Sequence, residues 1–249
     1  MSKVKLNKIG HYAYSIQPFE VDVHGNAFVH VLGNNLLHTA GRHADERGFG
    51  LNFMLKQKKA WVLSRMNIQL KELPKAYENF TIKTWIHNIE TIFSQRNFEV
   101  LSDNGALLAT ATTSWAAIDL VSRRPIPINS FIEEDYIPKE GIVDLSTPTK
   151  IQVANTPSFV KNHEVVYTDL DLNKHVYSIR YLEWMMNLFD LEYWNNKQLQ
   201  QITINYLAEI LYKDQLELRF VEVSSDVVQV VIFNKTRDKV AALGEFVWE

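Results

Sequence analysis

This chain of 249 residues contains the same series of hydrophobic patterns twice. In each half, a short apolar stretch precedes a helical pattern, and several strand-like runs follow. Short segments recur in the same order, because PFEVDV resembles NHEVVY, IQLKEL resembles INYLAEI, and ALLATATTSWAAI resembles KVAALGEFVW. One helix followed by antiparallel strands, present twice, predicts an α+β fold in which two sheets each wrap around a central helix. A single α+β domain with coincidental similarity between its halves is the alternative.

The two repeats are separated by a segment of different character. Prolines lie at positions 125, 127, 138, 148 and 157, and few apolar residues in this region recur periodically. Such a segment is long for a loop inside one compact domain. We therefore predict an N-terminal unit at residues 1–128, a connector at 129–160 and a C-terminal unit at 161–249.

Local patterns assign elements to each unit. Alternating apolar residues at 19–23 and 27–31 predict a strand, a turn and a second strand. A helix is expected next, with an Asn at 34 or 35 as its cap and Gly48 at its end. In the second unit, YSIRYLEWMMNLFDLEYW predicts the helix that four strands follow. The strand-like runs of the first unit are Ala60–Leu70, Asn79–Ile89, Phe93–Leu101 and Ala106–Leu120.

Composition excludes several classes of protein. The chain has no cysteine, which excludes disulfides, thiolate zinc sites and a cysteine nucleophile. Its net charge of -3, from 26 basic and 29 acidic residues, does not favour nucleic-acid binding. No stretch approaches the roughly 20 apolar residues that span a bilayer, and the N-terminus does not have the pattern of a signal peptide. We expect a cytoplasmic protein.

The strongest local signal for chemistry is Asp171-Leu172-Asn173-Lys174-His175, directly before the second predicted helix. A turning backbone can direct the three polar side chains to one side, and a helix start favours negative charge. An oxyanion could be stabilised there. The imidazole can orient a water molecule, with Asp171 or Asn173 setting its tautomer. An ordinary helix cap with a hydrogen-bonded histidine beside it is the alternative.

Glu209 is the second candidate, in the segment INYLAEILYKDQL. If the strand alternates through this segment, Glu209 shares a face with Leu207 and Leu211, where desolvation favours its neutral form unless His175 offsets it. Glu209 could then accept a proton from water. An edge-strand glutamate facing solvent is the alternative. Asp171, His175 and Glu209 could also hold a metal, but a second histidine in a matching place is lacking, and we expect neither a metal nor a cofactor.

These residues carry a resemblance to a known family. LDLNKHV followed by YLEW resembles the Asp-x-Asn-x-His motif of the acyl-acyl carrier protein thioesterases, which include plant plastid enzymes that release fatty acids. HTAGRHADERGFG, AWVLSRMNIQLKELPKAYENFTIKTWI and TTSWAAIDLVSRRPIPI resemble consecutive parts of the family's first unit. The similarity covers about residues 15–249. It implies a tandem double hotdog fold and hydrolysis of fatty acyl-acyl carrier protein thioesters.

The resemblance also implies roles for the candidate residues. Glu209 would activate water, His175 with Asn173 would position the water and the thioester carbonyl, and Asp171 would orient this group. The helix starting near Val176 would supply a backbone N–H to the oxyanion. Plant members commonly carry a cysteine after the glutamate, whereas this chain has isoleucine there. Water must therefore attack, directly or after transient capture by a carboxylate.

Substrate contacts follow from the same resemblance. The first unit would shape an acyl tunnel, with Trp61, Met66 and Trp85 as candidate lining. Basic residues would steer an acidic carrier protein toward the site. The candidates for that contact are Arg123, Arg124, Lys174 and Arg180. No plastid transit peptide precedes the similarity, so we expect a bacterial-type cytoplasmic member. Two copies of the chain, each with its pair of units, could form a homodimer.

Two alternative functions keep the same fold. Hotdog hydratases and dehydratases also use a carboxylate and a histidine, but typically five apart in a longer loop. Here Asp171 and His175 are four apart without an intervening proline, which favours the thioesterase. A non-catalytic acyl-binding module is the other alternative, because the first unit is expected to lack polar candidates in the equivalent place and both halves could be inactive.

Overall fold

The computed structural model describes residues 7–132, 134–153 and 156–249. The chain divides into two compact units. Unit 1 comprises Met1–Leu63 and Lys71–Thr147, and unit 2 comprises Ser64–Leu70 and Pro148–Glu249. Residues 1–6 of the predicted N-terminal unit, and residues 133, 154 and 155 of the predicted connector, lie outside the described residues.

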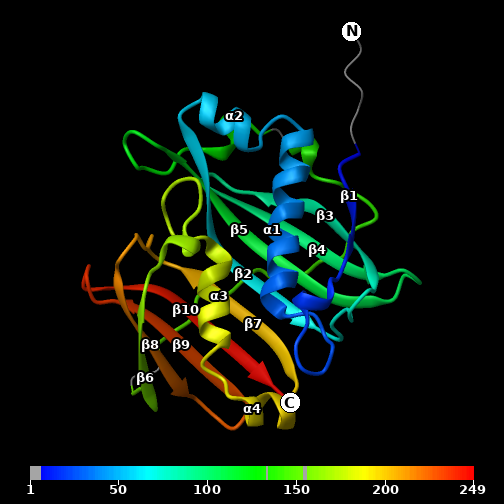
Figure 1. Cartoon of the computed structure of the whole chain (residues 1–249). Coiled ribbons are helices and arrows are strands. Elements are labelled where there is room, and N and C mark those ends of the chain that lie inside the picture. The colour runs from blue at the N-terminus through cyan, green and yellow to red at the C-terminus, as the bar shows by residue number, and fades with distance from the viewer. Residues whose placement is uncertain (1–6, 133, 154–155) are drawn as a thin grey trace. The chain divides into compact units, whose positions relative to one another are not determined.

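Unit 1 is a sheet with one long helix lying against it (Figure 1). Its strand order is β1-β3-β4-β5-β2, and the ladders from β1 through β5 are antiparallel. The strands are β1 (Gly10–Ser15), β2 (Lys59–Leu70), β3 (Asn79–Ile89), β4 (Phe93–Ser102) and β5 (Leu107–Asp119). The helices are α1 (Val29–Glu46), α2 (Leu51–Lys56) and the short 3-10 turns η1 (Pro18–Glu20), η2 (Ile128–Ser130) and η3 (Glu134–Tyr136).

Unit 2 repeats this plan (Figure 1). Its strand order is β7-β10-β9-β8-β6, and residues 65–69 of β2 pair antiparallel with β7. The strands are β6 (Phe159–Glu164), β7 (Leu199–Tyr206), β8 (Gln215–Glu222), β9 (Val227–Asn234) and β10 (Lys239–Trp248). The helices are η4 (Tyr167–Asp169), α3 (Ser178–Met186) and α4 (Leu191–Asn196).

The helices bury one apolar stripe each against their sheet. In α1, Leu32, Leu36 and Ala40 recur at intervals of four and are buried. In α3, Leu182 and Met185 are fully buried. Gly244 in β10 permits this close packing, because a Cβ atom there would lie 2.5 Å from the Met185 sulfur. The predicted α+β fold, with a sheet around each central helix, is therefore confirmed.

The prediction of a strand, a turn and a strand at residues 19–31 was wrong. Pro18–Glu20 form a 3-10 turn, Val21 and Ala27 make only an isolated bridge, and α1 begins at Val29. The Asp22 carboxylate accepts the backbone N–H groups of His24 and Asn26 and closes a tight turn instead. The helix begins well before the predicted asparagine cap, since Val29 lies on its buried face. Strand β1 was not predicted from the sequence.

The second predicted helix is broken into two. Helix α3 ends at Met186, and α4 begins at Leu191. The carboxylate of Asp190 accepts the N–H of Tyr193 at 2.7 Å and so caps a new helix start. Phe189, in the break, packs edge-on against Phe246. The periodic apolar residues predicted one continuous helix, but the capping aspartate within them starts a second helix.

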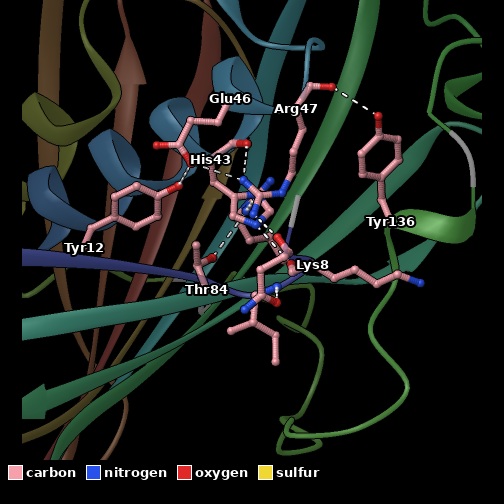
Figure 2. A network of polar contacts seen from close by, with 10 residues as sticks. Lys8, Tyr12, His43, Glu46, Arg47, Thr84 and Tyr136 are labelled. Carbon is pink, nitrogen blue, oxygen red and sulfur yellow. Dashed lines mark hydrogen bonds and ion pairs between the residues drawn. The ribbon is translucent and has the colours of Figure 1, made fainter. Parts of the chain in front are cut away.

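A network of buried polar contacts anchors α1 to the sheet of unit 1 (Figure 2). His43, fully buried on α1, lies 3.0 Å from an Arg96 guanidinium nitrogen through its Nδ1. Because arginine only donates, Nδ1 accepts, and Nε2–H donates to the Lys8 carbonyl at 3.1 Å. Arg96, on β4, also donates to the Thr84 hydroxyl on β3 at 3.3 Å. These contacts require a neutral imidazole with its proton on Nε2.

The remainder of the network lies at the end of α1 (Figure 2). Arg47 donates to the carbonyl oxygens of His43 and Asn7 and contacts the Glu46 carboxylate. The Tyr12 hydroxyl donates to the same carboxylate at 2.6 Å, and burial raises the pKa of Tyr12 to about 12. The C-terminal end of α1 is therefore held both by β1 and by the chain segment before it.

None of the helices in the described part of the chain combines the length and the apolarity that crossing a bilayer requires.

The buried imidazole makes the stability of unit 1 dependent on pH. Burial, with the charges of Arg96 and Arg47, lowers the pKa of His43 from 6.5 to about 2. The unfolded chain binds a proton at this residue below pH ~6.5, whereas the folded chain does not, so stability falls as the pH decreases from there. This group alone contributes up to about 1.4 kcal/mol per pH unit. We expect His43→Gln to flatten that decrease in denaturant unfolding measured between about pH 7 and pH 4.

The matched control for this prediction is His11→Gln, which changes an exposed histidine on β1. This variant should keep the slope of the wild-type protein. Parallel curves of unfolding free energy against pH for His43→Gln and the wild type would contradict the prediction.

Candidate active site

The candidate residues lie on two neighbouring loops of unit 2. Residues 171–175, which we call the histidine loop, lie between η4 and α3. Residues 207–214, which we call the glutamate loop, connect β7 to β8. The loops pair through a backbone bridge between His175 and Leu211, and the N–H of Val176 donates to the Ile210 carbonyl at 2.9 Å. Backbone pairing therefore brings the histidine loop against the glutamate loop.

The pairing places the imidazole of His175 beside the carboxylate of Glu209. Nε2 of His175 and Oε2 of Glu209 are 3.5 Å apart. Their side chains are 27% and 40% exposed, respectively, so a water molecule can reach both groups. An imidazole and a carboxylate within reach of one water molecule can together bind it and move its proton.

Glu209 does not lie on a strand, contrary to the sequence prediction. Strand β7 ends at Tyr206, and the N–H groups of Leu207 and Ala208 both donate to the Ala241 carbonyl, at 2.9 and 3.0 Å. Two consecutive donors on one acceptor end the alternation of faces. Leu207 is 52% exposed, so the predicted apolar setting between Leu207 and Leu211 was also wrong.

Asp171 shapes the histidine loop through the backbone. Its Oδ1 accepts the N–H of Asn173 at 2.8 Å and that of His175 at 3.2 Å. The N–H of Asp171 donates to the His175 carbonyl, which closes the loop in the other direction. Asn173 and Lys174 are exposed at the turn, and Lys174 has a φ of 62°. Of the three motif residues, the structure therefore brings His175 to Glu209 and uses Asp171 to form the turn.

Two tyrosines join helix α3 to the end of β7 and to the glutamate loop. The Tyr181 hydroxyl donates to the Ala208 carbonyl at 3.3 Å, and the Tyr206 hydroxyl donates to the Ser178 carbonyl at 3.2 Å. Burial raises the pKa of both phenols, so both remain neutral donors. The start of α3 is thus positioned next to the residues that precede Glu209.

Asp214 organises the glutamate loop and was missed by the sequence reasoning. It is 3% exposed and accepts from the Leu211 N–H at 2.9 Å, the Asn234 amide at 2.7 Å and the Arg237 guanidinium at 2.9 Å. Burial raises the pKa of this carboxyl, but these three donors together hold it below its usual value. An acid that recurs at the equivalent place of both repeats was the signal that could have revealed it.

The same loop occurs in unit 1. Oδ1 of Asp22 accepts the N–H of His24 at 2.9 Å and that of Asn26 at 3.0 Å, as Asp171 does for Asn173 and His175. Asn26 occupies the position of His175. The prediction that the first unit lacks polar residues in the equivalent place was therefore wrong, because an aspartate, a histidine and an asparagine are all present.

The glutamate loop is duplicated as well. The N–H groups of Lys71 and Glu72 both donate to the Leu108 carbonyl, the pattern seen for residues 207 and 208 in unit 2. Leu73 therefore occupies the position of Glu209. Glu78 accepts the Lys75 N–H at 2.9 Å, which matches Asp214. Unit 1 thus has the backbone of the site, but it has no imidazole at the position of His175 and no carboxylate at the position of Glu209.

These equivalences also test the sequence parallels. IQLKEL and INYLAEI align as predicted, and so do ALLATATTSWAAI and KVAALGEFVW. PFEVDV aligns with YTDLDL at 167–172 instead of NHEVVY, because the capping acids are Glu20 and Asp169. That parallel was wrong by five residues.

Two of the three candidate lining residues are fully buried, and Trp61 is partly buried. The indole N–H of Trp61 donates to the Phe49 carbonyl at 2.9 Å, and its ring contacts Phe131. Trp85, on β3, is fully buried. Met66 is also fully buried, on the part of β2 that belongs to unit 2 and opposite Ile204. Their contact with an acyl chain stays a prediction.

The candidate carrier-protein contacts are in different settings. Arg123 and Arg124 are exposed in the turn after β5 of unit 1. Lys174 is exposed at the tip of the histidine loop. Arg180, on α3, contacts the carboxylates of Glu183 and Asp169 and donates to a backbone carbonyl. Among the described residues, no cluster of three or more metal-binding side chains is present.

Comparison with known proteins identifies the family. Residues 8–136 match the model of the acyl-ACP thioesterase N-terminal domain, and residues 152–248 match that of the acyl-ACP thioesterase C-terminal domain. The chain belongs to the acyl-ACP thioesterase family. The resemblance inferred from the sequence is thereby confirmed.

Individual relatives support the assignment. A chloroplastic acyl-[acyl-carrier-protein] hydrolase from Cuphea viscosissima is 24% identical over 84% of this chain and 53% of its own length. The chain thus spans about half the length of that curated relative. The crystal structure of an acyl-ACP thioesterase from Bacteroides thetaiotaomicron is 35% identical, with a TM-score of 0.90 over 97% of this chain and 98% of its own. A 12:0-ACP thioesterase from Umbellularia californica, 17% identical with a TM-score of 0.83, covers 98% of both chains and shares the fold.

The buried carboxylate of Asp214 allows a test of how this thioesterase-family site is held. We expect Asp214→Asn to lower the free energy of unfolding by about 1.5–3 kcal/mol, because three donors, one of them the Arg237 guanidinium, then face a neutral acceptor instead of a charged one. Denaturant titration measures this change. The control is Asp226→Asn, an exposed aspartate of the same unit. An Asp214→Asn variant as stable as the control would contradict the assigned role.

Proposed function

We propose that this protein hydrolyses fatty acyl-acyl carrier protein thioesters to a free fatty acid and the carrier protein thiol. The observation that supports this function is the contact of 3.5 Å between His175 and Glu209, both accessible to water and both next to the start of α3. Family membership supplies the substrate class. That this chain carries out the reaction is our inference.

The chemistry requires one base and one water molecule. The Glu209 carboxylate accepts a proton from water as the water oxygen bonds to the thioester carbonyl carbon, and the carbonyl electron pair moves to its oxygen. When the carbonyl re-forms, the carbon–sulfur bond breaks, and the leaving thiolate takes the proton. His175, with the adjacent Asn173, positions the water molecule and the carbonyl, and Asp171 maintains the turn that presents them.

The oxyanion donor expected from the helix that starts near Val176 is not the N–H of Val176 itself. The N–H of Val176 donates to Ile210, and the N–H of Tyr177 donates to the Asp169 carbonyl. The first N–H groups of a helix have no partner within the helix, and we assign the oxyanion contact to those of Ser178 and Ile179. The helix dipole at this end also favours the negative charge that develops.

The absence of cysteine rules out an acyl-enzyme on sulfur. Ile210, which follows Glu209, is fully buried. Water attack, direct or after transient capture by the carboxylate, is therefore the mechanism we propose. A MaoC-like dehydratase from Phytophthora capsici, 13% identical with a TM-score of 0.55, shares the fold alone, and no observation on this chain favours dehydration.

We propose that unit 1 contributes the acyl-binding part and unit 2 the hydrolytic part. A cytoplasmic location and assembly into a homodimer stay predictions from the sequence.

The site can be tested with an isosteric variant. We expect Glu209→Gln to reduce kcat for release of free fatty acid from acylated carrier protein by about 10²–10⁴, because the amide cannot accept the proton. His175→Ala should have an effect of the same order. The control is Glu164→Gln, an exposed glutamate on β6 of the same unit. Turnover at the control level in both site variants would remove the proposed site, and hydration of an enoyl thioester by the wild type would favour the hydratase.

A further inference from the structure

Exposed apolar side chains gather around the proposed site in unit 2. Three segments contribute them, namely the chain before and within η4, the histidine loop and the glutamate loop. We call these five residues the rim. They are Val166 (50% exposed), Tyr167 (81%), Leu172 (92%), Leu207 (52%) and Tyr212 (51%).

The segments that carry the rim are joined by backbone hydrogen bonds. The N–H of Lys213 donates to the Val165 carbonyl at 3.2 Å, which places the end of the glutamate loop beside the chain that enters η4. The bridge between His175 and Leu211 places the histidine loop on the other side of the glutamate loop. The segments that carry the rim therefore lie next to one another and include both His175 and Glu209. Exposed apolar side chains gathered near a reactive site indicate a binding surface.

Two lysines extend this surface at unusual backbone positions. Lys174 and Lys213 have φ values of 62° and 64°, in the left-handed region that favours glycine. The equivalent residues of unit 1 are Gly25, with a φ of 80°, and Tyr77, with a φ of 66°. Lys174 offers the backbone no advantage over Gly25, its equivalent in unit 1. The feature that differs between the two repeats is therefore the lysine side chain.

The aspartates of these segments are held by hydrogen bonds within their own loops. Asp169, Asp171 and Asp214 each accept backbone N–H groups of their own loops. Asp169 and Asp214 also contact Arg180 and Arg237, respectively. Apart from Glu209 of the proposed site, these loops therefore use their carboxylates internally, and both lysines are exposed.

We propose that the rim, together with Lys174 and Lys213, is the surface on which the acyl carrier protein docks. An acidic protein that also offers an apolar patch fits five exposed apolar side chains flanked by two lysines. This inference rests on the proposed function, which requires a protein-bound thioester to reach Glu209. Arg180 is not part of the surface, because Glu183 and Asp169 already hold its guanidinium.

The first test measures docking without turnover. In a Glu209→Gln background, binding of acyl carrier protein is measured with and without the changes Lys174→Gly and Lys213→Gly, which suit the left-handed backbone while removing both charges. We expect the dissociation constant to rise about tenfold. Leu172→Ser should weaken binding separately. An unchanged dissociation constant in both cases would overturn the proposal.

The second test uses active enzyme and two substrates with the same acyl chain, one on acyl carrier protein and one on pantetheine. We expect the glycine double variant to lower the ratio of kcat/KM for the carrier substrate to that for the pantetheine substrate by about tenfold. A ratio equal to that of the wild type would contradict docking at this surface. A wild-type protein that hydrolyses neither thioester would contradict the proposed function instead.

The matched control in both tests is Lys58→Gly. Lys58 also has a positive φ, of 54°, but lies in unit 1 after α2. The same chemical change there should leave the dissociation constant and the substrate ratio at wild-type values. An equal effect of Lys58→Gly would show that loss of any lysine weakens carrier binding, and it would overturn the specific assignment.

Discussion

The backbone pairing between the histidine loop and the glutamate loop is the constraint on which the proposed site depends. The bridge from His175 to Leu211 and the bond from Val176 to Ile210 set the distance between an imidazole and a carboxylate that are far apart in sequence. Neither side chain needs to be buried for this, because the positions come from the main chain. The site can therefore remain open to water while its geometry is fixed.

Acids that bind backbone N–H groups form the frame of this arrangement in both units. Asp22 and Glu78 in unit 1 match Asp171 and Asp214 in unit 2. The two units therefore share a scaffold, and they differ at the two positions that carry the proposed chemistry. A duplicated chain can keep its turns under selection for folding while only one copy retains reactive groups, because turn formation and proton transfer use different side chains.

Particular elements show how far sequence reasoning reached. Strands β3 and β4 were predicted within one residue of their bounds, because alternation over ten residues is a strong signal. The region from residue 19 to 31 failed, since a few apolar residues alternate equally well in a turn followed by a helix start. Helix α3 was predicted too long, because the capping role of Asp190 competes with periodicity. Asp214 was missed, since its importance depends on Asn234 and Arg237, which the fold brings to it.

The sequence by itself determined the repeat, the family and the identity of the candidate residues, because local periodicity and a motif of five residues are contained in contiguous chain. The tertiary structure alone decided that His175 contacts Glu209, that Val176 is occupied by a hydrogen bond and that unit 1 retains the same loops. It also decided which charges face outward. Each of these depends on contacts between residues distant in sequence, and such contacts arise only when loops pair and acids find their donors.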